Sequence, residues 1–237
     1  WVYSVSFSPD GKLLASASYK TVKIYSISGS NLNLIKTLDD HSSWVNSVSF
    51  SPDGKYLASA SDDNTIKIYS IFDGTFNLIK TLNDHNDDVR SVSFSPNGKF
   101  LASDSDDKTV KIYSISGENF NLIKTIADIN NFYFSFSFSP DGKYLASAIG
   151  ENTVNFYSIS GDNFNLIKTL ADNSDRVYSV SISSDSKYLA SSSRDNVKIY
   201  SISNGNLNLA YTLEDHYRSV FSLSLSPDVK YLSTGGH

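Results

Sequence analysis

A five-residue turn, Ser-Pro-Asp-Gly-Lys, recurs along this chain at an almost constant spacing. Its proline falls at positions 9, 52, 96, 140 and 227, and Ser184 stands in its place once. Successive copies are therefore 43, 44, 44, 44 and 43 residues apart. A fixed period of this length is the mark of a repeat architecture whose unit is a small sheet of four strands.

Each repeat divides into four segments with the character of strands. In the second copy these are "WVNSVSF" (44–50), "YLASAS" (56–61), "TIKIYSI" (65–71) and "FNLIKTL" (76–82). The first alternates apolar and small polar residues, and the third is rich in β-branched residues. Short turns with Pro, Asp, Asn or Gly separate the segments. No helical periodicity of useful length occurs, so the fold class is predicted to be all-β.

The repeats predict five complete four-stranded antiparallel sheets and a sixth that stops after two strands. The expected boundaries are about 1–40, 41–84, 85–128, 129–172, 173–215 and a partial repeat over 216–237. A radial β-propeller, formed as a single domain over 1–237, buries both faces of each sheet against its neighbours. An open stack of sheets is the competing geometry.

Composition narrows the classes of partner. The formal net charge is −5, which argues against the basic face that nucleic acid requires. No apolar run is long enough to span a membrane, and no signal peptide is visible. Cysteine is absent, which excludes disulfides and thiolate metal sites. We expect an intracellular, cytoplasmic protein, whose natural N-terminus lies upstream because the chain opens on Trp1 in the middle of a repeat.

The order of these elements resembles the WD-repeat β-propeller family. Asp-His, a strand, Ser-Pro-Asp-Gly-Lys, "LASAS", an aspartate turn and "TIKIY" follow one another in register over essentially the whole chain. The sequence departs from that family in one constant way, because Tyr-Ser occupies the Trp-Asp position. The tyrosines at the Trp position are Tyr25, Tyr69, Tyr113, Tyr157 and Tyr200.

The resemblance implies a buried structural network of His, a second-strand Ser or Thr, a turn Asp and the aromatic residue. Only the second and third repeats carry every member, and in the fourth and fifth copies the His position reads Ile129 and Asn173. We therefore expect a partial network, with the sheets held mainly by packing. Its expected members are His41, Asp63, Tyr69, His85, Asp107 and Tyr113.

The sequence gives little support for a catalytic site or a cofactor site. Ser, His and Asp are all present, but the histidines recur with the repeat, as structural residues do, whereas a catalytic group is usually unique. The acidic pairs Asp62-Asp63 and Asp106-Asp107 fit short turns better than calcium loops. No two-histidine zinc spacing or glycine-rich phosphate loop occurs. We expect no catalytic residue, no cofactor and no metal.

The positions where near-identical repeats differ are the candidates for partner binding. One series lies near the start of each first strand, and in the resembled family this position faces the top surface, where peptides bind. Its members are Tyr3, Asn46, Arg90, Phe134, Tyr178 and Phe221; two residues earlier, Trp44 and Arg176 belong to a second variable series. Aromatic residues with arginine are the composition of an interaction hot spot. The alternative is that these rings only fill gaps between sheets, above all in "NFYFSFSFS" (131–139).

The sequence thus predicts a non-enzymatic scaffold that binds protein or peptide partners through its top rim. Two alternatives stay open. One is an architectural subunit of a larger complex that meets its neighbours through the outer "FNLIKTL" strands. The other is a propeller enzyme or sensor that holds a metal or small ligand in a central channel.

Overall fold

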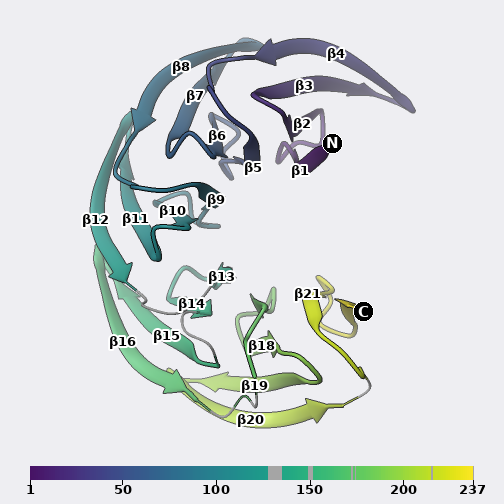
Figure 1. Ribbon diagram of the computed structural model, residues 1–237, viewed down its shortest axis with the longest axis vertical. Coiled ribbons are helices and arrows are strands. Elements are labelled where there is room, and N and C mark those ends of the chain that lie inside the picture. The colour runs from purple at the N-terminus through teal and green to yellow at the C-terminus, as the bar shows by residue number, and fades with distance from the viewer. Residues whose placement is uncertain (128–134, 149–151, 172, 174, 215, 237) are drawn as a thin grey trace. The chain divides into compact units, whose positions relative to one another are not determined.

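The computed structural model of the chain is built from β-strands (Figure 1). It describes every residue except 128–134, 149–151, 172, 174, 215 and 237. Over the described residues the strands form five four-stranded antiparallel sheets and one two-stranded sheet, which confirms the predicted fold class. Within that part of the chain, no helix has the length and apolar character needed to cross a membrane.

The chain divides into two compact units, Trp1–Ala127 and Asp128–His237. The first unit holds three complete sheets. Their strands are β1 (Val2–Phe7), β2 (Leu13–Ser18), β3 (Thr21–Ser28) and β4 (Asn31–Leu38); β5 (Val45–Phe50), β6 (Tyr56–Ser61), β7 (Ile66–Phe72) and β8 (Thr75–Leu82); and β9 (Val89–Phe94), β10 (Phe100–Ser105), β11 (Thr109–Ser116) and β12 (Asn119–Ala127). In Figure 1, β4, β8 and β12 form the outer side of this unit.

The second unit holds two complete sheets and the two-stranded sixth sheet. Their strands are β13 (Ser135–Phe138), β14 (Tyr144–Ala148), β15 (Val154–Ser160) and β16 (Asn163–Leu170); β17 (Ser179–Ile182), β18 (Tyr188–Ser192), β19 (Val197–Ser203) and β20 (Asn206–Leu213); and β21 (Val220–Leu225) and β22 (Leu232–Gly236). The second repeat therefore gives four strands within one residue of the segments predicted from its sequence.

The core lies between neighbouring sheets. On the second sheet, Ala58, Ala60 and Ile68 are fully buried against Val89 and Leu101 of the third sheet. Alanine and serine in the second strand keep this face shallow, so that the larger side chains of the next sheet pack closely on it. The opposite face of the second sheet packs in the same way on the first. Burial on both faces explains why the repeat tolerates few large polar residues in its second strand.

Serine hydroxyls connect the first strands of neighbouring sheets. The backbone N–H of Val48 donates to Ser4 Oγ (3.4 Å), and that of Val92 donates to Ser47 Oγ (3.2 Å). In the second unit, the N–H of Val180 donates to Ser135 Oγ (3.1 Å). We call this arrangement the serine ladder; its other pairs are Phe50 with Ser6, Phe94 with Ser49 and Ile182 with Ser137. The ladder satisfies amide groups on the edge of each first strand that no fifth strand pairs.

The recurring turn is fixed by one hydrogen-bond pattern. In the first copy, Ser8 Oγ donates to Asp10 (2.6 Å), and the Gly11 N–H donates to the Ser8 carbonyl (2.9 Å). Gly11 adopts a φ of 68°, which glycine reaches without strain. Where glycine is replaced, Ser186 and Val229 keep the left-handed conformation, with φ values of 59° and 58°. The rest of the turn therefore imposes this conformation even on a β-branched residue.

Candidate functional site

The second repeat builds a buried polar network around His41. The ring nitrogen Nδ1 lies 2.8 Å from Asp63 Oδ2, and Nε2 lies 2.8 Å from Ser59 Oγ. Asp63 also accepts hydrogen bonds from Thr65 Oγ1 (2.6 Å) and from the Ser42 backbone N–H (2.9 Å). Burial alone would raise the pKa of Asp63, but the hydrogen bonds from His41, Thr65 and Ser42 outweigh it and lower that pKa.

Tyr69 joins this network at a different point from the one that the family resemblance implies. Its hydroxyl donates to Asp40 Oδ2 at 3.1 Å, beside the histidine rather than through it. Burial, and then the nearby Asp40 carboxylate, raise the pKa of Tyr69, so the phenol stays protonated. Tyr69 is 1% exposed and also packs in the core between the first and second sheets. Its contribution therefore combines packing with one hydrogen bond.

The third repeat copies the arrangement. His85 lies 2.8 Å from both Asp107 Oδ2 and Ser103 Oγ, and Tyr113 is fully buried. Burial lowers the pKa of His85, although Asp107 acts in the opposite direction. A neutral histidine can donate one hydrogen bond from Nδ1 to the carboxylate and accept one at Nε2 from the serine hydroxyl.

The fifth and sixth repeats have other hydrogen bonds at the histidine position. In the sixth sheet, His216 Nε2 lies 2.8 Å from Thr234 Oγ1. In the fifth repeat, Asn173 takes the histidine position and exchanges hydrogen bonds with Asn152 (3.3 and 3.4 Å). This asparagine pair joins the histidine position of the fifth repeat to the turn between the second and third strands of the fourth sheet.

The geometry of Ser59, His41 and Asp63 resembles a nucleophilic triad, but its burial does not fit one. Ser59 is fully buried, and the His41 side chain is 1% exposed, so neither can reach a substrate. A serine nucleophile needs an accessible Oγ with donors for the developing oxyanion beside it. The same arrangement at His85 shows that it belongs to the repeat. Among the described residues, no group of three His, Asp or Glu side chains is arranged to hold a metal ion.

The variable positions gather at the end of each sheet where the first strand begins and the second turns into the third; we call this end the top rim. In the first unit, Tyr3 and Trp44 are in edge-to-face contact, with ring centroids 5.3 Å apart. In the second unit, Tyr178 contacts Phe221 at 5.0 Å and its hydroxyl accepts a 3.2 Å hydrogen bond from Ser219. Each of these contacts joins the first-strand region of one sheet to that of the next.

Arg90 and Asn46 are tied into the rim by carboxylates. Arg90 forms ion pairs with Asp62 (2.8 Å) and Asp88 (2.9 Å), and a further pair with Asp106. The Asn46 side chain donates to Asp62 and to the Val89 carbonyl (3.0 Å). The hydrogen bond to Asp106 raises the pKa of Arg90, so the guanidinium stays charged. Arg90 is thus a fixed part of the rim rather than a free cation.

Two of the predicted rim positions give less information about a binding site. Arg176 lies at the rim of the second unit, where its backbone N–H donates to Asp175 (2.7 Å). Phe134 lies outside the described residues, as does most of the strongly apolar segment around it.

Sequence reasoning missed three rim residues and one buried acid. Tyr19 contacts Trp44 at 5.1 Å, and Lys20 lies over the Tyr19 ring. Tyr19 occupies the position of Asp62 in the next repeat, and this difference was readable in the sequence. Asp88 occupies the position of Trp44 in the third repeat and pairs with Arg90 at the rim. Asp104 breaks the "LASAS" pattern and is 1% exposed.

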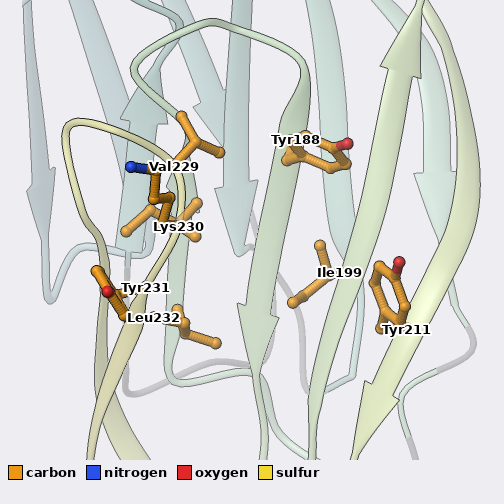
Figure 2. A pocket seen from close by; sticks show the side chains of 8 residues that line it. Tyr188, Ile199, Tyr211, Val229, Lys230, Tyr231 and Leu232 are labelled. Atoms are coloured by element: carbon orange, nitrogen blue, oxygen red, sulfur yellow. The ribbon is translucent and has the colours of Figure 1, made fainter.

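A cavity of about 220 Å³ lies between the fifth and sixth sheets of the second unit (Figure 2). Tyr188, Ile199 and Tyr211 line one side, and Tyr231 and Leu232 line the other. Where two complete sheets meet, the tyrosine that corresponds to Tyr188 is covered by the next sheet. The covering segment is the turn between that sheet's third and fourth strands. Tyr56, for example, donates to the Gly117 carbonyl at 3.0 Å. The cavity is therefore a packing position beside a two-stranded sheet, and its lining combines aliphatic side chains with three tyrosines and Lys230.

Comparison with known families agrees with this architecture. The profile described as "WD domain, G-beta repeat" matches residues 1–26, 32–70, 76–114, 124–158, 164–201 and 207–237. A search of curated proteins gave no significant match. Each of the last five matches begins on the fourth strand of one sheet and continues through the first strands of the next, and the second and third matches contain the His–Ser–Asp networks. The chain belongs to the WD40 repeat family.

Proposed function

We propose that this protein is a non-enzymatic scaffold that binds a protein or peptide partner through its top rim. WD40 repeats generally serve as protein-interaction scaffolds. The observation that carries the proposal is the contrast between a uniform core and a varied rim. Tyr3 is 48% exposed and Phe221 is 42% exposed, while Val48, Val92 and Val180, on the first strands of the second, third and fifth sheets, are 3–5% exposed. Exposed aromatic rings held by neighbours lose little conformational entropy when a partner binds.

The burial of the histidine networks supports a non-catalytic role. Both complete networks use their serine, histidine and aspartate to join strands inside a sheet; the serine and histidine are buried, and the side chains of Asp63 and Asp107 are only 9% and 7% exposed. The groups that are accessible at the rim are aromatic rings, amides and paired charges. Such groups provide contact area and orientation for a partner.

A second candidate function rests on the outer strands. Each of the five carries an exposed leucine at the same position, and each is 40–53% exposed; these are Leu34, Leu78, Leu122, Leu166 and Leu209. A row of apolar side chains on outer strands suits an architectural subunit that meets its neighbours edge to edge.

Selection from a random peptide library separates these functions. Peptides are selected on the immobilised protein and then tested on a rim variant, Tyr3→Ser with Tyr178→Ser, and on an edge variant, Leu34→Ser with Leu122→Ser. We expect the selected peptides to bind the edge variant as they bind the wild type, and to lose binding to the rim variant. Loss in the edge variant alone would favour the architectural role. Equal binding to all three proteins would refute the rim proposal, provided that circular dichroism shows each variant to be folded.

A further inference from the structure

Three aromatic rings form an accessible surface on the rim between the first and second sheets. We call Tyr3, Tyr19 and Trp44 the aromatic patch. The two tyrosines approach Trp44 edge-on, at 5.3 Å with an interplanar angle of 80° and at 5.1 Å with 72°. Tyr3 is 48% exposed and Tyr19 is 55% exposed. The patch therefore presents ring surface to solvent in a fixed arrangement.

A cationic side chain of the protein already lies on this patch. The Lys20 ammonium is 5.3 Å from the centre of the Tyr19 ring, within the range of a cation–π contact. Lys20 follows Tyr19 directly and is exposed, so this contact is local and leaves Tyr3 and Trp44 uncovered by it. The chain itself thus shows the kind of group that these rings attract.

The surroundings of the patch carry surplus negative charge. The Asp62 backbone N–H donates to the Trp44 carbonyl (2.9 Å), so the two residues are neighbours in the chain's backbone pairing, and the Asp62 carboxylate faces Asn46 and Arg90. Among the described residues, Asp62, Asp88 and Asp106 all form ion pairs with Arg90. Burial, and then the charge of Asp62, raise the pKa of Asp88 in spite of Arg90. One guanidinium therefore does not balance the three carboxylates, and a further positive charge nearby would be favourable.

We propose that the partner of this rim is a positively charged peptide segment. A lysine or arginine side chain lies on the open faces of Tyr3 and Trp44, and a second basic residue pairs with the carboxylates around Arg90. An acidic segment would add to the repulsion, and a purely apolar one would desolvate the carboxylates with no opposite charge. This inference rests on the proposed function and names the chemistry of its partner.

The test uses three fluorescein-labelled octapeptides in which glycine alternates with arginine, glutamine or glutamate. Binding to the purified protein is followed by fluorescence polarisation at low and at physiological ionic strength. We expect the arginine peptide to bind, the other two to bind at least tenfold more weakly, and the affinity to fall as salt rises.

Variants locate the binding. The double variant Tyr3→Leu with Tyr19→Leu keeps apolar side chains but removes two aromatic rings. It should lower the affinity for the arginine peptide about 5- to 30-fold. Tyr211→Leu makes the same chemical change on β20, where Tyr211 is 64% exposed, and should leave affinity unchanged. Asp88→Asn should weaken binding and reduce its dependence on salt.

The outcomes separate this inference from the proposed function. If the glutamine peptide binds as well as the arginine peptide, or if the double tyrosine variant binds like the wild type, the inference is wrong. If library-selected peptides still depend on the rim in that case, the proposed function stands and only the chemistry assigned to its partner falls. If the selected peptides do not depend on the rim, both the inference and the proposed function are wrong.

Discussion

Asp104 is a buried acid at a position that the repeat reserves for a small side chain. The corresponding residues Ala17, Ala60 and Ala148 are 0–1% exposed, and Asp104 is 1% exposed. Its Oδ1 accepts no hydrogen bond from the described residues. Burial raises the pKa of Asp104 from the ordinary aspartate value of 3.8 to about 7, and a hydrogen bond with Ser91 offsets this only in part. Replacing Asp104 with alanine should therefore stabilise the protein at neutral and alkaline pH.

The size and sign of the effect follow from linkage. Below pH 3.8 the carboxyl is protonated in both the folded and the unfolded state, so it makes no difference to stability. As pH rises toward 7 the unfolded chain loses this proton while the folded protein keeps it, and the free energy of unfolding falls. A difference of about 3 pH units corresponds to about 4 kcal/mol at about 1.4 kcal/mol per unit. Because alanine also gives up the packing of the carboxyl group, we expect a net gain of about 1–3 kcal/mol at pH 8.

Urea unfolding followed by far-ultraviolet circular dichroism measures this gain. The difference between Asp104→Ala and wild type should be largest at pH 8 and should shrink steadily toward pH 4. Asp104→Asn retains the shape and removes the charge, so it should show the same pH-dependent difference with a smaller gain. A destabilised Asp104→Ala protein at pH 8, or a gain that does not change between pH 4.5 and pH 8, would refute the reasoning.

Other predictions concern the network and the turns. His41→Ala or Asp63→Ala should lower the free energy of unfolding by about 1–3 kcal/mol, the cost of leaving a buried polar partner unpaired, and an unchanged melting temperature would argue against that role. Because the folded-state pKa of His85 is lowered, its contribution to stability is present above about pH 6.5 and is lost as pH falls. In chemical denaturation between pH 6.5 and 5, His85→Asn should therefore lose less of its free energy of unfolding than the wild type. Val229→Gly should stabilise by about 1 kcal/mol because it relieves a left-handed β-branched residue, and Lys230→Gly, at the next position in the same loop, should give no such gain.

Much of the fold could be predicted because each repeat has the same local sequence pattern of strands and turns. The strand "YLASAS" is β6, residue for residue, since its small side chains fit only a face on which another sheet packs closely. The Pro-Asp-Gly turn fixes the register of the first two strands, and the outer strand follows from its own alternation. The network members His41 and Asp63 could be located because their spacing is that of the repeat.

The rim was harder to predict, because its contacts join residues from different repeats. Arg90 reaches back to Asp62 in the preceding repeat, and Tyr19 reaches forward to Trp44. No local propensity encodes such pairs, and a position that varies among repeats gives no pattern to extend. The hydrogen bond of Tyr69 to Asp40 was not predicted, because it depends on the direction of a long side chain.

The serine ladder has a consequence for how such a chain can change in length. Donor and acceptor occupy the same places between the first and second, the second and third, and the fourth and fifth sheets, so in these pairs one repeat supplies the hydroxyls that its successor needs. A duplicated or deleted unit would leave matched surfaces on both sides of the change. Gene duplication can therefore alter the copy number without a compensating substitution, while the few rim positions are free to diverge afterwards in each copy.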